Sequence, residues 1–149
     1  MTPEEQDVRV RAAVYDVTIA TGTPAKAKRL GEILALPEKA VRESLERLAT
    51  SRALVLQPGS REVLMANPFS AVPTPFAVHA DEQLYFGNCI WDALGIPAML
   101  GVDGCVQSSC ACCGEAMELF VSDSSLEPIS AAIHFAVPAH RWWQDIVYN

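Results

Sequence analysis

The sequence predicts an α+β protein in which a winged-helix-like three-helix module precedes a small mixed sheet carrying one further helix. Three observations support this fold class. Apolar residues follow helical spacing through most of residues 1–50, short alternating segments dominate after residue 75, and a proline-rich stretch separates the two regions. Half of the residues are hydrophobic, which is enough for a substantial core and excludes a disordered chain.

Residues 1–66 read as three helices and a β-hairpin. Pro3, Glu4 and Glu5 suit the first turn of a helix that runs to Gly22. A shorter helix is expected from Thr23-Pro24 to about Leu34, and a third from Pro37-Glu38, with an apolar stripe. The stripe consists of Val41, Leu45 and Leu48, and the hairpin strands Leu54–Leu56 and Val63–Met65 flank a turn at residues 57–60. We expect residues 1–66 to form a winged-helix-like domain.

The third predicted helix lacks a clear basic face. Its three basic residues alternate with three acids, whereas a helix that reads DNA usually presents a basic surface. The basic residues are Lys39, Arg42 and Arg47, and the acids are Glu38, Glu43 and Glu46. We expect a packing module and no nucleic-acid partner, with DNA binding as the alternative.

Residues 67–80 are predicted to be an extended linker. Pro68, Pro73 and Pro75 each push the preceding residue out of helical conformation. Residues 81–149 then form the second domain, with a helix from about Asn88 to Leu100. Its sheet is expected from strands at residues 76–78 and 83–86, Val102–Ser108, Met117–Val121 and Ile133–Val137.

Charge and composition restrict the partners. The net charge is −7, and residues 67–149 hold nine acids against one basic residue, Arg141. This half should repel a phosphate backbone and suits a small, soft or cationic substrate. No apolar run reaches the roughly 20 residues of a membrane span, and the acidic N-terminus is unlike a secretory signal. We expect a cytoplasmic protein whose five cysteines are mostly thiols.

Cys89 and Asp92 form the main candidate site. Asn88 is a good N-cap residue, which places Cys89 in the first helical turn, where the helix dipole lowers a thiol pKa. Asp92 lies three residues later and therefore projects from the same face. Such a pair can bind a soft electrophile and carry a proton. The structural alternative is that Cys89 is a buried small hydrophobe and Asp92 helps to cap the helix.

The sequence around this pair resembles the alkylmercury (organomercurial) lyase family. The resemblance rests on residues 67–75 (Asn-Pro-Phe-Ser-Ala-Val-Pro-Thr-Pro) and 85–98 (Tyr-Phe-Gly-Asn-Cys-Ile-Trp-Asp-Ala-Leu-Gly-Ile-Pro-Ala). It continues through residues 108–115 and 138–146, and the predicted N-terminal module agrees with it. The resemblance thus extends over nearly the whole chain.

The resemblance implies that Cys89 and Asp92 are catalytic and that the reaction is protonolysis of a carbon–mercury bond to a hydrocarbon and Hg(II). Mercury is soft and prefers thiolate, and a buried Asp92 with a raised pKa would supply the proton. No cofactor is required, and Hg(II) is the bound product. The implied partners are a small organomercurial substrate and small thiols or a mercury-accepting reductase, with no membrane.

One family feature is absent from the sequence. The family uses a second cysteine beyond the segment that matches residues 138–146, and no cysteine follows Cys113 here. We therefore expect either a C-terminally incomplete chain, with the second cysteine beyond Asn149, or a short homologue that has lost full lyase activity.

A cysteine cluster gives a second candidate site. Cys110-Ala111-Cys112-Cys113-Gly114 contains a Cys-x-x-Cys-Gly knuckle, the shape of half a zinc ribbon. The expected metal ligands are Cys89, Cys110 and Cys113, with Cys105 and Cys112 as further candidates and zinc as a candidate ion at the cluster. The alternative is reduced thiols on a hairpin turn, with Cys110 matching a structural cysteine of the family.

Two other functions stay open from the sequence. One is a thiol-rich metal-binding or metal-sensing winged-helix protein that breaks no bond. The other is an enzyme with the lyase fold in which Cys89 attacks a different electrophile.

Overall fold

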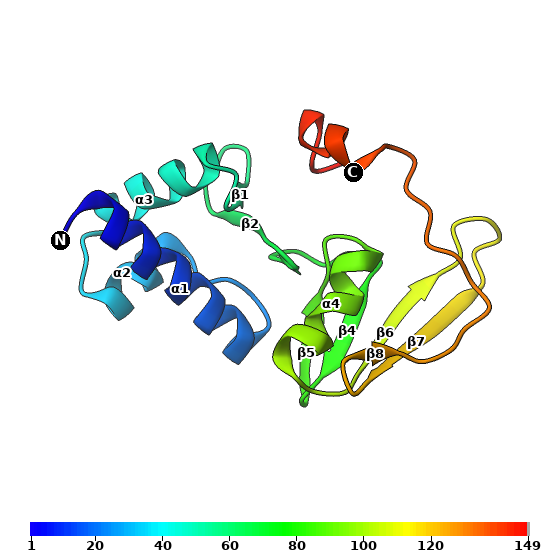
Figure 1. Cartoon of the computed structure of the whole chain (residues 1–149). Helices are drawn as coiled ribbons and strands as arrows, with labels where there is room; N and C mark the ends of the chain where they lie inside the picture. The colour runs from blue at the N-terminus through cyan, green and yellow to red at the C-terminus, as the bar shows by residue number, and fades with distance from the viewer. Residues whose placement is uncertain (149) are drawn as a thin grey trace.

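The computed structural model describes residues 1–148, and its first part is helical (Figure 1). Helices α1 (Pro3–Thr21), α2 (Ala27–Leu34) and α3 (Glu38–Thr50) pack around a common core. The N-terminus of α1 carries a capping box between Thr2 and Glu5, which satisfies free N–H groups of its first turn. The core consists of Val10, Ala13, Val14, Ala27, Leu30, Val41, Leu45, Leu48, Leu54, Leu56, Val63 and Ala66. The first and third predicted helices are therefore present, and α2 begins later than expected.

A three-stranded antiparallel sheet follows the helices. Strand β2 (Val63–Ala66) lies between β1 (Val55–Leu56) and β3 (Phe69–Ser70). The first two strands form the hairpin that the sequence predicts after the third helix. Strand β3 lies within residues 67–80, the segment expected to be a linker, and its two residues are buried. The winged-helix prediction depends on this order of three helices followed by a hairpin. The winged-helix assignment itself stays a prediction.

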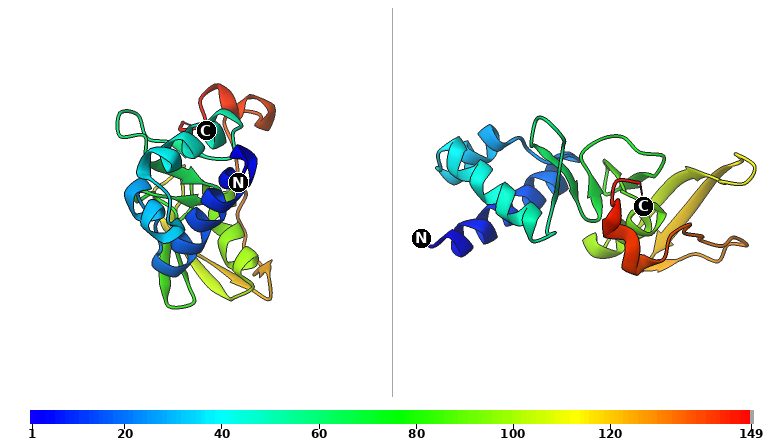
Figure 2. Two further views of the ribbon diagram at one scale, coloured as in Figure 1. Left: turned by 90° about the vertical axis from the view of Figure 1, so that its left-hand side faces the viewer. Right: turned by 90° about the horizontal axis from the view of Figure 1, so that it is seen from above.

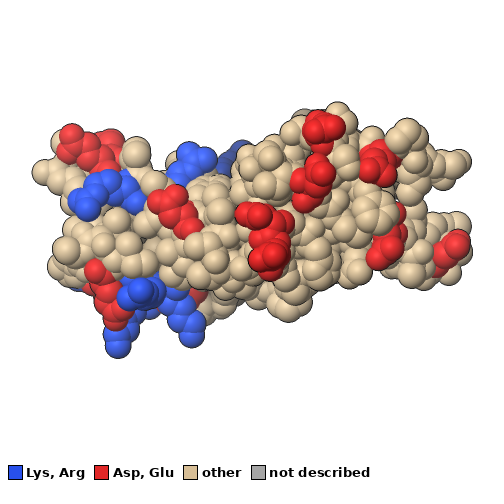
Figure 3. Space-filling model, turned by 90° about the horizontal axis from the view of Figure 1, so that it is seen from below, with Lys and Arg blue, Asp and Glu red and all other residues tan. Residues whose placement is uncertain are grey.

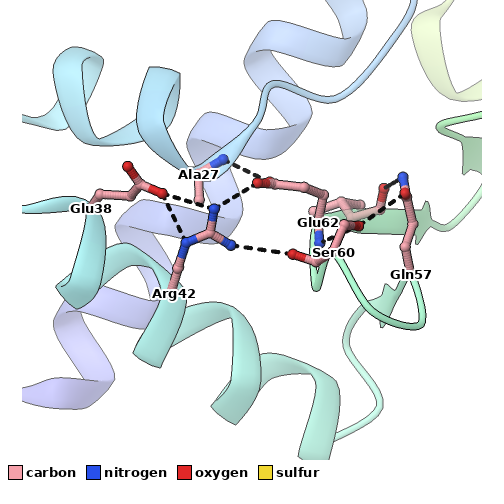
Figure 4. A network of polar contacts seen from close by, with 7 residues as sticks. Ala27, Glu38, Arg42, Gln57, Ser60 and Glu62 are labelled. Carbon is pink, nitrogen blue, oxygen red and sulfur yellow. Dashed lines mark hydrogen bonds and ion pairs between the residues drawn. The ribbon is translucent and has the colours of Figure 1, made fainter.

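A polar network joins this hairpin to α2 and α3 (Figure 4). Arg42 donates to Glu38 at 2.8 Å and to Glu62 at 2.9 Å, and the second oxygen of Glu62 accepts from the backbone N–H of Ala27 at 2.8 Å. The Glu62 side chain is only 15% exposed, so its contacts with Arg42 and Ala27 are partly shielded from solvent, whereas the Arg42–Glu38 pair is exposed. The carboxylate of Glu62 thus accepts from a free N–H group at the N-terminus of α2. This helix begins at Ala27, whereas the sequence predicted a start at Thr23-Pro24.

The basic side chains of α3 are all paired with acids. Lys39 pairs with Glu43, Arg42 with Glu38 and Glu62, and Arg47 with Asp7. In the space-filling view, blue and red atoms mix over the helical half, whereas the sheet half shows acids and no blue (Figure 3). These pairings argue against a surface that attracts a nucleic-acid backbone.

The second sheet has five strands in the order β5-β4-β6-β7-β8. Its strands are β4 (Ala77–Ala80), β5 (Gln83–Phe86), β6 (Gly104–Ser109), β7 (Ala116–Ser122) and β8 (Ser125–Leu126). Every pair is antiparallel, so the prediction of a mixed sheet was wrong. The crossover through the next helix does make β5 and β6 run in the same direction. Because β4 lies between them, they form no parallel pair.

Helix α4 (Ile90–Leu100) packs against one face of this sheet and builds the second core. Side chains that alternate along the strands, such as Val78, Val106 and Leu119, point to this face. The other buried members of the core are Phe69, Ala80, Tyr85, Ala93 and Ile96. The helix expected from about Asn88 is therefore present, and it forms the layer that carries the candidate site.

Three aromatic residues connect the helical and sheet halves, which lie at opposite ends of an elongated molecule (Figure 2). The rings of Tyr15 (in α1) and Phe69 meet edge-on, with their centres 6.4 Å apart. The centres of the Phe69 and Tyr85 rings are 5.4 Å apart. The Tyr15 hydroxyl donates to the carbonyl of Asn67 and the Tyr85 hydroxyl to that of Ile19, both at 2.8 Å. The proline-rich segment is thus held against α1 and β5.

The strand predicted at Ile133–Val137 is absent, so that prediction was wrong. The segment after β8 runs as irregular chain, and Ile133 is 41% exposed. Apolar alternation predicts a strand only where a neighbouring strand and a buried face are available, and this segment has neither among residues 1–148. After this segment, Ala139–Gln144 form a 3₁₀-helix, whose Trp143 ring centre lies 5.4 Å from the Arg52 guanidinium. Within the described residues, no helix is both long and apolar enough to span a bilayer.

Candidate functional site

The N-terminus of α4 brings Cys89 and Asp92 together. Cys89 is the N-cap residue in extended conformation, and its Sγ accepts a hydrogen bond from the backbone N–H of Asp92 at 3.4 Å. The prediction that Asn88 caps the helix was wrong, because the sulfur of Cys89 takes that role. The two side chains therefore lie on the same turn, as the spacing of three residues predicts.

Asn88 instead ties the start of α4 to the proline-rich segment. Its Nδ2 donates to Asn67 Oδ1 at 2.9 Å and to the carbonyl of Phe69 at 3.2 Å. Its backbone N–H donates to the carbonyl of Pro68 at 3.3 Å. The Oδ1 atom of Asn88 is buried without a hydrogen-bond partner in the described structure. Asn88 is thus a positioning residue for Cys89, a role that capping preferences did not suggest.

Gly87 allows α4 to approach the sheet closely. A Cβ atom at this position would lie 2.6–2.7 Å from the backbone N, Cα and Cβ of Ala93. Gly87 also bridges to Phe69 of β3, and its carbonyl accepts from the Thr74 hydroxyl at 2.6 Å. The missing side chain therefore lets the strand end, the helix and the proline-rich segment meet at the site.

Burial dominates the protonation of Cys89. It raises the pKa of the thiol, and the backbone N–H of Asp92 only partly offsets this. The nearby Asp92 carboxyl raises the pKa of the thiol further. The expectation that the helix N-terminus leaves Cys89 with a lowered pKa was wrong, because desolvation of the thiolate outweighs the hydrogen bonds from the backbone N–H groups of Asp92 and Trp91. The resting side chain favours the neutral thiol.

Burial also raises the pKa of Asp92, as expected for a buried carboxyl, with the Asn88 amide lowering it in part. Cys89 and Asp92 are both half-buried. The site thus combines a thiol that retains its proton with a carboxyl that accepts and holds one more readily than a carboxyl in water. Such a pair can exchange a proton while the sulfur binds a ligand.

The remaining cysteines lie elsewhere. Cys110, Cys112 and Cys113 occupy the turn between β6 and β7, whereas Cys105 lies within β6, about 16 Å of extended chain before Cys110. All five cysteines are free. Among the described residues, no group of three or more His, Cys, Asp or Glu side chains is arranged to hold a metal ion. The structure therefore does not assemble the ligands of a tetrahedral zinc site.

Two surface hollows lie at the other end of α4. One of about 400 Å³ is lined by residues that include Leu100, Asp81 and Tyr85, and one of about 610 Å³ by residues that include Gly101 and Asp103. Neither is lined by Cys89 or Asp92. These two hollows therefore do not mark the candidate site, which is recognised by its side-chain chemistry.

Comparison with known proteins identifies one family. The family model for alkylmercury lyase matches residues 69–148, more than half of the chain, and includes Cys89, Asp92 and the cysteine turn. None of the curated proteins matches the chain. Among solved structures, the mercury-bound form of MerB2 is similar at 22% identity and a TM-score of 0.64. The match covers 85% of this chain and 60% of that one, so the chain spans less than two thirds of its neighbour's length, and the likeness shows a shared fold.

Proposed function

The chain belongs to the alkylmercury lyase family, and we propose that it cleaves carbon–mercury bonds in small organomercurials by protonolysis, using Cys89 and Asp92. The observation that carries this proposal is the half-buried pair at the N-cap of α4, where Cys89 Sγ accepts from the N–H of Asp92 and burial raises the pKa of both side chains. A soft ligand atom and a proton carrier on one helical turn are the two components that the reaction needs.

The first step is ligand exchange at mercury. The substrate reaches the site as an organomercury thiolate, and the sulfur of Cys89 replaces the small thiolate on Hg(II). The thiol proton of Cys89 passes to the Asp92 carboxylate, whose raised pKa favours accepting it. Proton transfer makes the exchange feasible because the thiol of Cys89 ionises less readily than one in water.

The second step is protonation of carbon. Asp92 returns its proton to the carbon bound to mercury, and the electron pair of the carbon–mercury bond becomes the new C–H bond. Mercury stays in the +2 state on the sulfur of Cys89, and the hydrocarbon leaves. Asp92 ends as a carboxylate, ready for another cycle.

Small thiols complete the coordination of the product. We assign the second sulfur on Hg(II) to a small thiol from solution, because the other described cysteines lie on β6 and on the turn between β6 and β7. Small thiols or a mercury-accepting reductase then remove Hg(II). This chemistry requires a supply of reduced thiols, which fits the cytoplasm.

Turnover of phenylmercury tests the proposal. The protein is incubated with phenylmercury and excess small thiol, and benzene is measured by gas chromatography. We expect benzene from the wild type and none above background from Cys89→Ser, while Cys112→Ser, which changes an exposed cysteine of the turn, retains the wild-type rate. Wild-type turnover in Cys89→Ser would remove Cys89 from the mechanism.

The second candidate function is mercury binding without bond cleavage. It is favoured by the five free cysteines of the chain, each of which offers a soft sulfur ligand for Hg(II). Tight Hg(II) binding at Cys89 with no benzene release would establish this alternative and refute the lyase proposal. Tryptophan fluorescence reports such binding, because the 66% exposed Trp91 lies two residues from Cys89 and a bound heavy atom quenches it.

A further inference from the structure

The turn between β6 and β7 presents three cysteines that the proposed lyase reaction does not use. The two strands pair in regular register up to Ser109 and Ala116, which fixes the base of the turn. Cys110, which is half-buried, opens the turn, and the exposed Cys112 and Cys113 lie at its tip.

Backbone hydrogen bonds close this turn tightly. The N–H of Cys110 donates to the carbonyl of Glu115, and the N–H of Gly114 donates to the carbonyl of Cys110, both at 2.8 Å. Gly114 has a φ of +76°, a conformation that a side chain would strain. The turn therefore holds Cys110 and Cys113 on the same loop without a cross-link.

Within the turn, neighbouring donors are directed at the sulfur of Cys110. The backbone N–H groups of Cys113 and Cys112 and the Cys113 thiol all lie within hydrogen-bonding reach of it. Successive backbone N–H groups around one anion are a common way for turns to bind sulfur or phosphate.

The number of available ligands favours a soft, two-coordinate ion over zinc. A structural zinc site usually takes four ligands, and the described residues offer no group of three or more. Two thiols on one turn suit a soft ion that is satisfied by linear coordination between two sulfurs. We propose that Cys110 and Cys113 form a second mercury(II) site, a bis-thiolate separate from Cys89. Each thiol gives up one proton, two S–Hg bonds form, and mercury remains Hg(II).

This site lies at the same end of the sheet as the α4 N-terminus. Ala77 of β4 pairs with Phe86 of β5 on one side and with Gln107 of β6 on the other. Strands β5 and β6 run in the same direction, so both leave the sheet at this end. Cys89 lies three residues after Phe86, and Cys110 lies three residues after Gln107. The proposal does not depend on carbon–mercury cleavage, and it stands or falls without the lyase activity.

Mercury chloride titration tests the proposal. Hg(II) bound per chain is counted by mass spectrometry under non-denaturing conditions in the presence of a small competing thiol, with circular dichroism as the check of folding. We expect the double variant Cys110→Ser/Cys113→Ser to bind one Hg(II) fewer than the wild type, and the matched variant Cys112→Ser to bind as many as the wild type. Equal binding by the wild type and the double variant would overturn the proposal, as would a loss in Cys112→Ser as large as that in the double variant.

A measurement on the unmodified sequence gives an independent result. The protein is treated with iodoacetamide before and after loading with one equivalent of Hg(II) per expected site, and each alkylated cysteine is mapped. We expect loading to protect Cys110 and Cys113 at least tenfold while Cys112 stays reactive. Alkylation of Cys110 and Cys113 at unchanged rates, or equal protection by zinc chloride, would refute a mercury-selective bis-thiolate site.

Discussion

Replacing Gly87 by Ala should both destabilise the fold and displace the candidate site. The added Cβ would lie 2.6 Å from the backbone N of Ala93, far inside the 3.4 Å at which ordinary contact begins. Because two of the three close contacts are backbone atoms, α4 itself must move. Overpacking of this kind costs roughly 1–3 kcal/mol of unfolding free energy. A shift of about 1 Å in Cys89 and Asp92 would lower turnover by about 10²-fold.

Gly95→Ala is the matched control on the same helix. A Cβ at Gly95 has nothing within 4 Å, so this substitution should raise the free energy of unfolding by roughly 0.5–1 kcal/mol through helix propensity alone. Urea unfolding measures the free energy of unfolding of both variants. In a thermal melt, a change of 1 kcal/mol corresponds to a Tm shift of about 2–4 °C for a chain of this size. Adding Ala93→Gly to Gly87→Ala should not restore stability. If Gly87→Ala unfolds within about 0.5 kcal/mol of the wild type, the proposed close approach is wrong.

Three further predictions concern the proton carrier, a contact within the helical half and a contact between the two halves. Asp92→Asn should reduce benzene release roughly 10²–10⁴-fold while Hg(II) binding persists. Burial raises the pKa of Asp92, so its stabilising effect is present below the unfolded pKa and lost as pH rises through the folded pKa. The variant should therefore unfold at higher urea at neutral pH and lack that pH-dependent loss; equal pH profiles of stability would contradict this. Glu62→Ala should cost about 1–3 kcal/mol by leaving the N–H of Ala27 unpaired, Glu62→Gln should cost less, and unchanged urea midpoints would refute this role. Tyr85→Phe removes the 2.8 Å hydrogen bond to Ile19 and should cost about 0.5–1.5 kcal/mol in the same assay, with no change counting against that bond's contribution.

Local patterns in the sequence were sufficient for much of the architecture. Helical spacing, with proline and acidic residues at the start, predicted α1 and α3, and the i, i+3 spacing placed Cys89 and Asp92 on one turn. These features depend on contacts between residues only a few positions apart. The family was recognised from the sequence alone for a similar reason, since its motif is a contiguous stretch around that turn.

Tertiary structure decided the features that depend on distant residues. Whether α4 is capped by Asn88 or Cys89 depends on Asn67 and Phe69, which attract the Asn88 side chain away from the helix. Strand pairing followed the same rule, because β4 separates β5 from β6 and Ile133–Val137 finds no partner among the described residues.

The protonation of Cys89 shows the division most clearly. The sequence by itself determined that Cys89 and Asp92 share one turn at the start of a helix, which suggested a lowered thiol pKa. Only the folded chain decided the direction of the shift, because packing around the N-terminus of α4 removes solvent from the sulfur and raises its pKa. A helix dipole is set by the local chain, whereas desolvation is set by whatever else the chain packs nearby.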